Sequence, residues 1–181
     1  MADAINLKNG QRAQRKTLIT VAEWSDGSDT QVREILGART EDSSIEFNPD
    51  TETTTDILGI TYTDVNKTEP QQDFDPYYLL GGSKLGAYLS QAALENRIDD
   101  YNGTFNVYII TAFAGAAGSY KAVKHTGCSI LPTSIGGDSY VSMPIEVHFS
   151  NNITKGTVDK LSDDFVFTAD GEAAASTGSS T

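Results

Sequence analysis

The sequence feature that most constrains the fold is an alternation of apolar and other side chains in two long stretches. Residues 105–113 and 141–149 each place an apolar side chain at nearly every second position. Because the side chains of a strand alternate between its two faces, each stretch predicts a strand with one buried face. Shorter runs rich in β-branched and aromatic residues predict further extended segments at 17–22, 31–39, 43–48, 51–63, 120–134 and 165–167.

A single helix is predicted beside these strands. Leu85, Tyr88, Leu89 and Ala92 recur at helical spacing within residues 84–97, and Ser83 is a suitable N-cap. An amphipathic helix of this kind buries its apolar stripe against a sheet. The expected fold class is therefore mainly β, a β-sandwich or partly closed barrel with one flanking α-helix.

The polar segments indicate how the chain is divided. We expect residues 1–16 to be a basic N-terminal arm, residues 17–168 the β domain, and residues 169–181 a disordered tail without bulky side chains. Within the domain, residues 40–56 are a polar excursion with little to bury, and residues 67–76 are a polar connection containing two prolines. Residues 51–63 carry Ile57, Leu58, Ile60 and Tyr62 and are predicted to return the chain to the core.

The net charge of −12 is unevenly distributed along the chain. The arm carries Lys8, Arg12, Arg15 and Lys16 against a single acidic residue, whereas residues 23–75 carry fourteen acidic and three basic side chains. Such an acidic surface repels phosphate, which argues against tight DNA binding through counterion release. No run approaches the roughly 20 apolar residues that span a bilayer, and residues 1–16 lack the apolar stretch of a signal peptide. We therefore expect no membrane association and assembly in a cytoplasm.

Several residues carry reactive or metal-binding groups, but none forms a convincing constellation. His125 and Cys128 have only His148 as a further imidazole, whereas a zinc site normally needs four ligands, and no oxyanion loop accompanies the thiol. We expect Cys128 to be buried and the neighbouring imidazole to be on the surface. The Gly-Gly-Ser-Lys run at 81–84 lacks the spacing of a phosphate-binding loop. The acidic pairs Asp73 and Asp75, and Asp163 and Asp164, are expected by chance among 25 acidic residues.

We therefore predict no enzyme activity, no catalytic residue, no metal and no cofactor. The aromatic residues Trp24, Tyr77 and Tyr78 could stack on a sugar, but such residues are more often core or interface anchors. Both interpretations remain open at this point.

Several continuous segments resemble one family of proteins. They are residues 45–53, 60–76, 81–85, 124–128, 136–140 and 144–158, which together extend across most of residues 17–167. These segments resemble the major tail tube proteins of long-tailed, siphovirus-type bacteriophages, in particular those of phages that infect Gram-positive hosts. The resemblance implies a β-sandwich with one flanking helix that forms hexameric rings, stacked into a tube around the exit path of the genome.

The resemblance also implies partners and a location. The partners are further copies of this chain and the tail initiator, tape-measure and tail-terminator proteins, while DNA passes without specific binding. The location is the virion tail, assembled in the host cytoplasm. Two alternatives remain open, namely the tube subunit of a tail-like bacteriocin and a monomeric β-sandwich module that binds a sugar or a protein through Trp24 and Tyr77.

Within such a tube, an acidic wall would keep a polyanion centred and mobile. Alternation places Glu46 opposite Ile45 and Phe47, and it places Glu52 and Asp56 on one face, so Glu46, Glu52 and Asp56 are the candidates for the lumen. An outer, solubilising position is the alternative for the same three residues. The basic arm, with Lys8, Arg12, Arg15 and Lys16, is expected to dock on the acidic region of a neighbour, and residues 40–56 are expected to become ordered only between rings.

Overall fold

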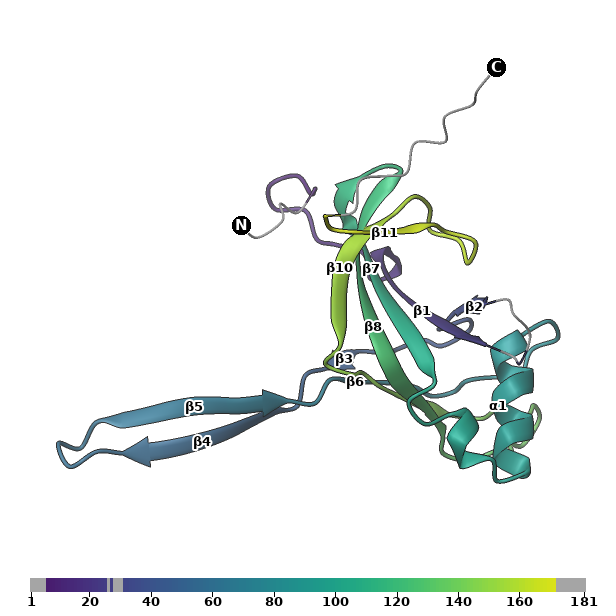
Figure 1. The fold of residues 1–181 in the computed structure, drawn as a ribbon, viewed down its shortest axis with the longest axis horizontal. Helices are drawn as coiled ribbons and strands as arrows, with labels where there is room; N and C mark the ends of the chain where they lie inside the picture. Colours follow the sequence, from purple (N-terminus) through teal and green to yellow (C-terminus); the bar gives the residue numbers. More distant parts are fainter. Residues whose placement is uncertain (1–5, 26, 28–30, 172–181) are drawn as a thin grey trace, which may run out of the picture. The chain divides into compact units, whose positions relative to one another are not determined.

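The computed structural model describes residues 6–25, 27 and 31–171. It is mainly β, with antiparallel strands and a single α-helix among the described residues (Figure 1). The predicted fold class is confirmed in these respects, but the sheet is not closed into a barrel because its path has two end strands, β2 and β3. The chain divides into two compact units, which are described in turn.

The first unit comprises Met1–Leu36, Asn106–Thr126 and Asn151–Thr181. After a short 3₁₀ turn, η1 (Arg15–Thr17), its strands follow the order β2 (Gln31–Ile35), β1 (Leu18–Ser25), β7 (Phe105–Ala116), β8 (Ser119–Pro132), β10 (Ile153–Val158) and β11 (Phe167–Ala169). Figure 1 shows β7 and β8 side by side, joined by a short turn. Strand β1 pairs antiparallel with β2 and β7, and β10 pairs antiparallel with β8 and β11.

The core of the first unit is built from aromatic and β-branched side chains. Val21 of β1 lies opposite Tyr108 of β7, and the rings of Phe165 and Phe167 lie edge-on to the Tyr108 ring at 5.0 and 5.4 Å between centroids. Edge-to-face contacts of this kind stabilise a core beyond the area that they bury. The remaining buried members of the cluster are Ile110, Ala122 and Val158.

The second unit comprises Gly37–Phe105 and Gly127–Ser150. Its sheet contains the end of β8, then β9 (Ile145–His148), β6 (Gln71–Phe74) and β3 (Ile45–Glu46), with antiparallel pairing throughout. The prediction that residues 67–76 are a polar connection is wrong for Gln71–Phe74, which form a strand inside this sheet. Phe74 is buried, and the fully buried Gln72 amide donates to Ser43 Oγ at 3.0 Å, so its burial leaves that polar group satisfied.

Helix α1 (Lys84–Leu94) belongs to the second unit and confirms the predicted helix, although it ends three residues earlier than residue 97. The Ser83 hydroxyl accepts a hydrogen bond from the Gly86 amide at 2.9 Å, which is the predicted N-cap. Leu85, Leu89 and Ala92 are buried. Asn96 follows the helix with a φ of 55°, a left-handed conformation that asparagine tolerates, and a 3₁₀ turn, η2 (Ile98–Asp100), comes next.

The largest difference from the sequence-based expectation is a hairpin in the second unit, formed by β4 (Pro49–Thr55) and β5 (Thr61–Thr68). Residues 51–63 were predicted to return to the core, but every residue of both strands is exposed. Residues 49–55 also fold by pairing with β5, so this part of the predicted polar excursion is ordered within one chain. The reason is local, because threonines favour strands and a short turn allows the two threonine-rich runs to pair with each other.

The C-terminal part of the chain differs from the expectation in two ways. Strand β10 was not predicted, and the final strand is Phe167–Ala169 rather than residues 165–167. Most of the predicted disordered tail, residues 172–181, lies outside the described residues. The proposed boundaries of the arm and of the tail remain predictions.

Candidate assembly surfaces

The two faces of the β4–β5 hairpin differ in chemistry. The pairing places Thr53 opposite Thr63 and Thr55 opposite Thr61, with hydroxyl oxygens 3.5 and 3.2 Å apart. With Thr51 opposite Val65, these residues form an uncharged face, which we call the threonine face. Cross-strand threonine pairs stabilise a sheet modestly, by about 0.2–1 kcal/mol each.

The opposite face carries negative charge. Glu52 lies directly opposite Asp64, and Thr54 lies opposite Tyr62, so that two carboxylates share one cross-strand position on what we call the acidic face. Like charges directly opposite each other destabilise a strand pair. A cation from another molecule would therefore stabilise the hairpin at this position.

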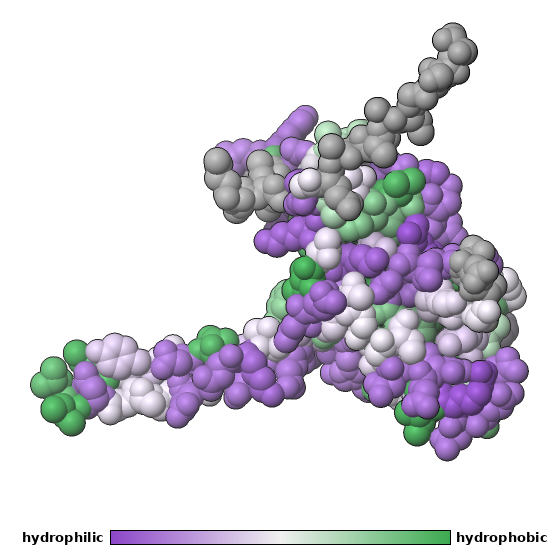
Figure 2. All heavy atoms as spheres, in the orientation of Figure 1, coloured by the Kyte–Doolittle hydropathy of each residue, from purple (hydrophilic) through white to green (hydrophobic). Residues whose placement is uncertain are grey.

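The hairpin tip, residues 56–60, is a fixed turn that displays apolar side chains. The Asp56 carboxylate accepts hydrogen bonds from the amides of Leu58 and Ile60, both at 2.9 Å, and the Asp56 amide donates to the Ile60 carbonyl at 3.0 Å. Gly59 has a φ of 78°, which a larger residue would adopt only with strain. Ile57 is 102% exposed and Leu58 is 79% exposed. Figure 2 shows the apolar atoms gathered at this end of the hairpin.

The second unit also contains a partly apolar pocket of about 310 Å³. Its wall is held by backbone pairing, because Leu79 donates to the Val141 carbonyl at 3.1 Å and Tyr78 forms an isolated bridge with Ser142. The Tyr78 and Tyr140 rings lie edge-to-face with centroids 6.5 Å apart. The lining residues are Arg39, Tyr78, Leu79, Leu80, Tyr140 and Val141.

Gly81, Gly82 and Ser83 of the Gly-Gly-Ser-Lys run line a second hollow, which shares Leu79 and Leu80 with this pocket. Gly82 has a φ of 91°, and the Ser83 hydroxyl is occupied by the helix N-cap. Gly82 therefore lets the backbone turn into the helix.

The basic arm is anchored to the first unit at its first described residue. The Asn6 amide donates to the Phe113 carbonyl at 2.9 Å, and the Asn6 side chain donates to the Gly115 carbonyl. The basic side chains of the arm, those of Lys8, Arg12, Arg15 and Lys16, are exposed. Arg15 Nη1 donates to the Leu18 carbonyl at 2.6 Å, so this arginine also holds the start of β1.

The three candidate lumen residues do not lie on a single element. Glu46 is an exposed residue of β3, paired with the Gln71 position of β6, whereas Glu52 lies on the acidic face of the hairpin. Asp56 has a structural role in the tip, because its carboxylate holds the turn. Their assignment to a channel wall remains a prediction.

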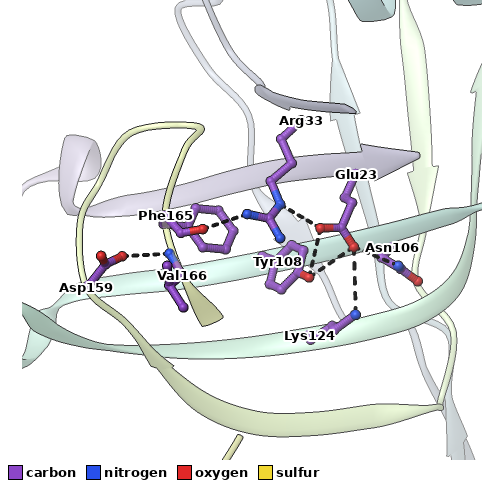
Figure 3. A network of polar contacts seen from close by, with 8 residues as sticks. All are labelled: Glu23, Arg33, Asn106, Tyr108, Lys124, Asp159, Phe165 and Val166. Carbon is purple, nitrogen blue, oxygen red and sulfur yellow. Dashed lines mark hydrogen bonds and ion pairs between the residues drawn. The ribbon is translucent and has the colours of Figure 1, made fainter. Parts of the chain in front are cut away.

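A network of polar contacts is buried in the first unit (Figure 3). Glu23 is buried, and its carboxylate accepts hydrogen bonds from Arg33 Nε at 2.5 Å, Asn106 Nδ2 at 2.8 Å and the Tyr108 hydroxyl at 3.1 Å. Lys124 Nζ lies 3.7 Å from the same carboxylate. Arg33 also donates to the Phe165 carbonyl at 2.6 Å, which ties β2 to the segment before β11.

The ionisation of this network follows from its contacts. Burial raises the pKa of Glu23, but hydrogen bonds from Asn106 and Arg33 and the charges of Arg33 and Lys124 outweigh it, so the pKa is lowered overall. Burial and the adjacent Glu23 carboxylate raise the pKa of the Tyr108 hydroxyl. The network is therefore a charged and hydrogen-bonded cluster that connects β1, β2, β7 and β8.

The other candidates from the sequence are structural. Trp24 and Tyr77 are buried and cannot stack on a sugar, whereas Tyr78 lines the pocket. Cys128 is buried as predicted, but His125 is also buried, contrary to the expected surface position. Gly127, with a φ of 81°, interrupts the alternation between them, so each is buried in its own unit.

Among the described residues, no group of three or more His, Cys, Asp or Glu side chains could hold a metal ion. No helix within the described residues is long and apolar enough to cross a membrane.

Two distinctive surfaces, the apolar tip and the pocket, were not predicted from the sequence. Asp56 and Gly59 bracket the tip between two threonine-rich runs, which is a recognisable turn signal. The pocket had no such signal, because Arg39, Tyr78 and Tyr140 are far apart in the sequence and only the fold brings them together.

Comparisons with known proteins find similarity in structure rather than in sequence. No protein-family model and no curated protein matches this chain. A chain in the cryo-EM structure of the anti-feeding prophage (AFP) baseplate, 6-fold symmetrised, is similar with a TM-score of 0.43 and 11% identity, over 82% of this chain and 97% of that chain.

Proposed function

We propose that this chain is a structural subunit of a phage tail tube, which forms stacked, hexameric rings around a channel for genome delivery and catalyses no reaction. The observation that carries the proposal is the β4–β5 hairpin, whose strands are exposed along their whole length. A two-stranded hairpin is marginally stable by itself in water. We therefore infer that the hairpin binds another molecule, which would stabilise it.

The sheet edges supply a second kind of contact. Among the described residues, β2 pairs only with β1, and β3 pairs only with β6, so each unit has an end strand with one unpaired side. Unpaired edges are sites for strand addition by another chain. Two different edges that meet head-to-tail form a heterologous contact, which closes into a ring when the rotation between copies allows it.

The resemblance of residues 45–53, 60–76 and 144–158 to tail tube proteins supports the same proposal, because two of these segments include parts of the hairpin. In this role the chain contacts copies of itself within and between rings. It also contacts the initiator, tape-measure and terminator proteins of the virion tail, and DNA passes through the channel without specific binding.

The first prediction concerns the hairpin. Replacing residues 51–66 by an Asn-Gly turn keeps the pairing of Asp50 with Lys67 and removes the rest of the hairpin beyond that pair. We expect a folded subunit that no longer forms tubes. Negative-stain imaging of the concentrated protein, with and without tail initiator complex, measures this directly, and circular dichroism checks that the variant is folded.

The matched control is Thr53→Ser, which keeps a hydroxyl on the threonine face and should polymerise as the unmodified chain does. Normal tubes from the shortened variant would show that the hairpin is dispensable. A protein that stays monomeric at all concentrations, even with initiator present, would refute the tube proposal and favour the monomeric binding module.

The second prediction concerns the channel wall. Changing Glu46 to lysine should leave tubes intact but slow DNA ejection, because cations on the wall hold phosphates at every ring. Asp56 is left unchanged because its carboxylate holds the hairpin tip, and Glu52 is left unchanged because it lies on the acidic face of the hairpin. High salt should restore the rate by screening these contacts. Normal ejection by intact tubes of this variant would place Glu46 outside the channel.

A further inference from the structure

The hairpin tip has the properties of a docking element. Asp56 fixes the turn through hydrogen bonds to two tip amides, so the apolar side chains are held out before any partner binds. Ile57 and Leu58 are almost fully exposed and adjacent, and Ile60 is half exposed beside them. A contiguous apolar patch on an ordered turn marks an interaction site more strongly than scattered exposed residues do. Preorganisation also lowers the entropy lost on binding.

The pocket of the second unit is complementary to this tip in two respects. Leu79, Leu80 and Val141 supply an apolar lining beside two tyrosine rings, and the volume of about 310 Å³ is enough to admit an aliphatic side chain. Arg39, which also lines the pocket, has no ion-pair partner among the described residues. The tip ends in Asp56 and continues into the acidic face with Glu52 and Asp64, which supplies the opposite charge.

We propose that the hairpin tip of one copy of this chain inserts Leu58, with Ile57 beside it, into the Arg39, Tyr78 and Tyr140 pocket of a second copy. The tip does not occupy the pocket of its own chain, because Ile57 and Leu58 are exposed there. The inference rests on the proposed function for the identity of the partner as another copy, and it names the surface that receives the hairpin.

The contact is heterologous, since each copy carries one tip and one pocket on different surfaces. Every copy can therefore give its tip to one neighbour and receive the tip of another, which propagates an assembly instead of stopping at a closed dimer. The apolar insertion supplies most of the affinity, and Arg39 facing the acidic hairpin favours the correct orientation.

A cross-linking experiment tests the contact itself. One protein carries Leu58→Cys and another carries Tyr140→Cys, and the native Cys128 is buried and stays in place. Under mild oxidation at assembling concentration, the mixture should give a disulfide-linked dimer at least about ten times faster than a mixture of Leu58→Cys with Val166→Cys. Val166 is a matched control because it is an exposed apolar residue of the first unit. Equal rates in the two mixtures would overturn the proposal.

A charge exchange provides the second test. Leu58→Lys places a cation against Arg39 and should weaken self-association by at least about tenfold, measured by sedimentation. Adding Arg39→Glu to the same chain should restore part of the self-association, because the new pair has opposite charges although the attraction between Arg39 and the acidic face is lost. A merely structural effect of Leu58→Lys would not be rescued, and that result would refute the docking.

The two tests separate this inference from the tube proposal. Tubes in negative stain without preferential cross-linking from residue 58 to residue 140 would refute the docking and leave the tube proposal standing. Cross-linking and charge rescue in assemblies that are not tubes would support the docking and refute the tube. Failure of both measurements would refute both.

Discussion

Replacing Glu23 by glutamine is expected to destabilise the first unit by about 3 kcal/mol. The substitution leaves Arg33 and Lys124 without their carboxylate, and Arg33 also spans the Tyr108 and Phe165 rings at 5.5 and 4.4 Å. Removing one partner of a buried ion pair costs roughly 3–5 kcal/mol, and the partial exposure of Arg33 places this case at the lower end. Urea unfolding followed by tryptophan fluorescence measures the change, since Trp24 lies in the adjacent position of β1.

The matched control is Glu69→Gln, which removes an ion pair with Lys67 at 2.6 Å in which both side chains are exposed. Exposed pairs contribute little to stability, so this variant should keep the unfolding midpoint of the unmodified chain. If Glu23→Gln shifts the midpoint no more than Glu69→Gln does, the Glu23 network does not stabilise the first unit.

The same carboxylate sets a pH dependence. The pKa of Glu23 in the folded chain is below its ordinary value of 4.5, so the unfolded chain binds more protons in the window between these two values. The stabilisation from Glu23 is therefore present above about pH 4.5 and is lost as the pH falls through the lowered pKa. The stability difference between the unmodified chain and Glu23→Gln should shrink in that acidic window.

Replacing Gly156 by valine is expected to destabilise the folded chain by about 3 kcal/mol, because it disturbs the pairing of β10 with β11. A Cβ at position 156 would lie 2.3 Å from the Thr168 carbonyl oxygen and 2.7 Å from the Phe167 ring, and the backbone atom cannot move aside without opening the strand pair. Overpacking of this kind costs roughly 1–3 kcal/mol of stability. The valine also disrupts the contact between the Phe167 and Tyr108 rings, so we expect a cost at the upper end of this range.

Amide hydrogen exchange at Thr168, which pairs with Thr157, measures whether β11 has separated from β10. The control is Gly136→Ala, because nothing lies within 4 Å of a Cβ at that position. The valine variant should lose protection at Thr168 and lower the unfolding midpoint, whereas the control should do neither. Unchanged protection in the valine variant would show that β10 and β11 tolerate a wider separation.

Local sequence patterns were sufficient for some elements and insufficient for others. The α1 helix was predictable because its apolar spacing and its Ser83 cap lie within a few consecutive residues. The β6 strand was missed because Gln72 looks like a loop residue until Ser43, far along the chain, satisfies its amide. Burial of a polar side chain depends on a partner that the local pattern does not contain.

The alternation in residues 105–113 predicted the strand correctly but not its buried side. Phe105 and Val107 are buried on one face of β7, and Tyr108 and Ile110 are buried on the other, so the buried face changes between Val107 and Tyr108. A local alternation assigns one buried face to a strand, and it does not show where the buried face changes within that strand.

For the candidate surfaces, the sequence by itself determined the composition, and the tertiary structure decided the position. The acidic excess of residues 23–75, the basic arm and the threonine-rich runs are properties of the sequence alone. Ile57 and Leu58 were assigned to the core because apolar side chains usually gain by burial. The structure exposes them, since β4 and β5 pair with each other and the Asp56 carboxylate holds the turn at the tip. The pocket that we propose to receive them exists only after residues 39, 78–80 and 140–141 have been brought together by folding.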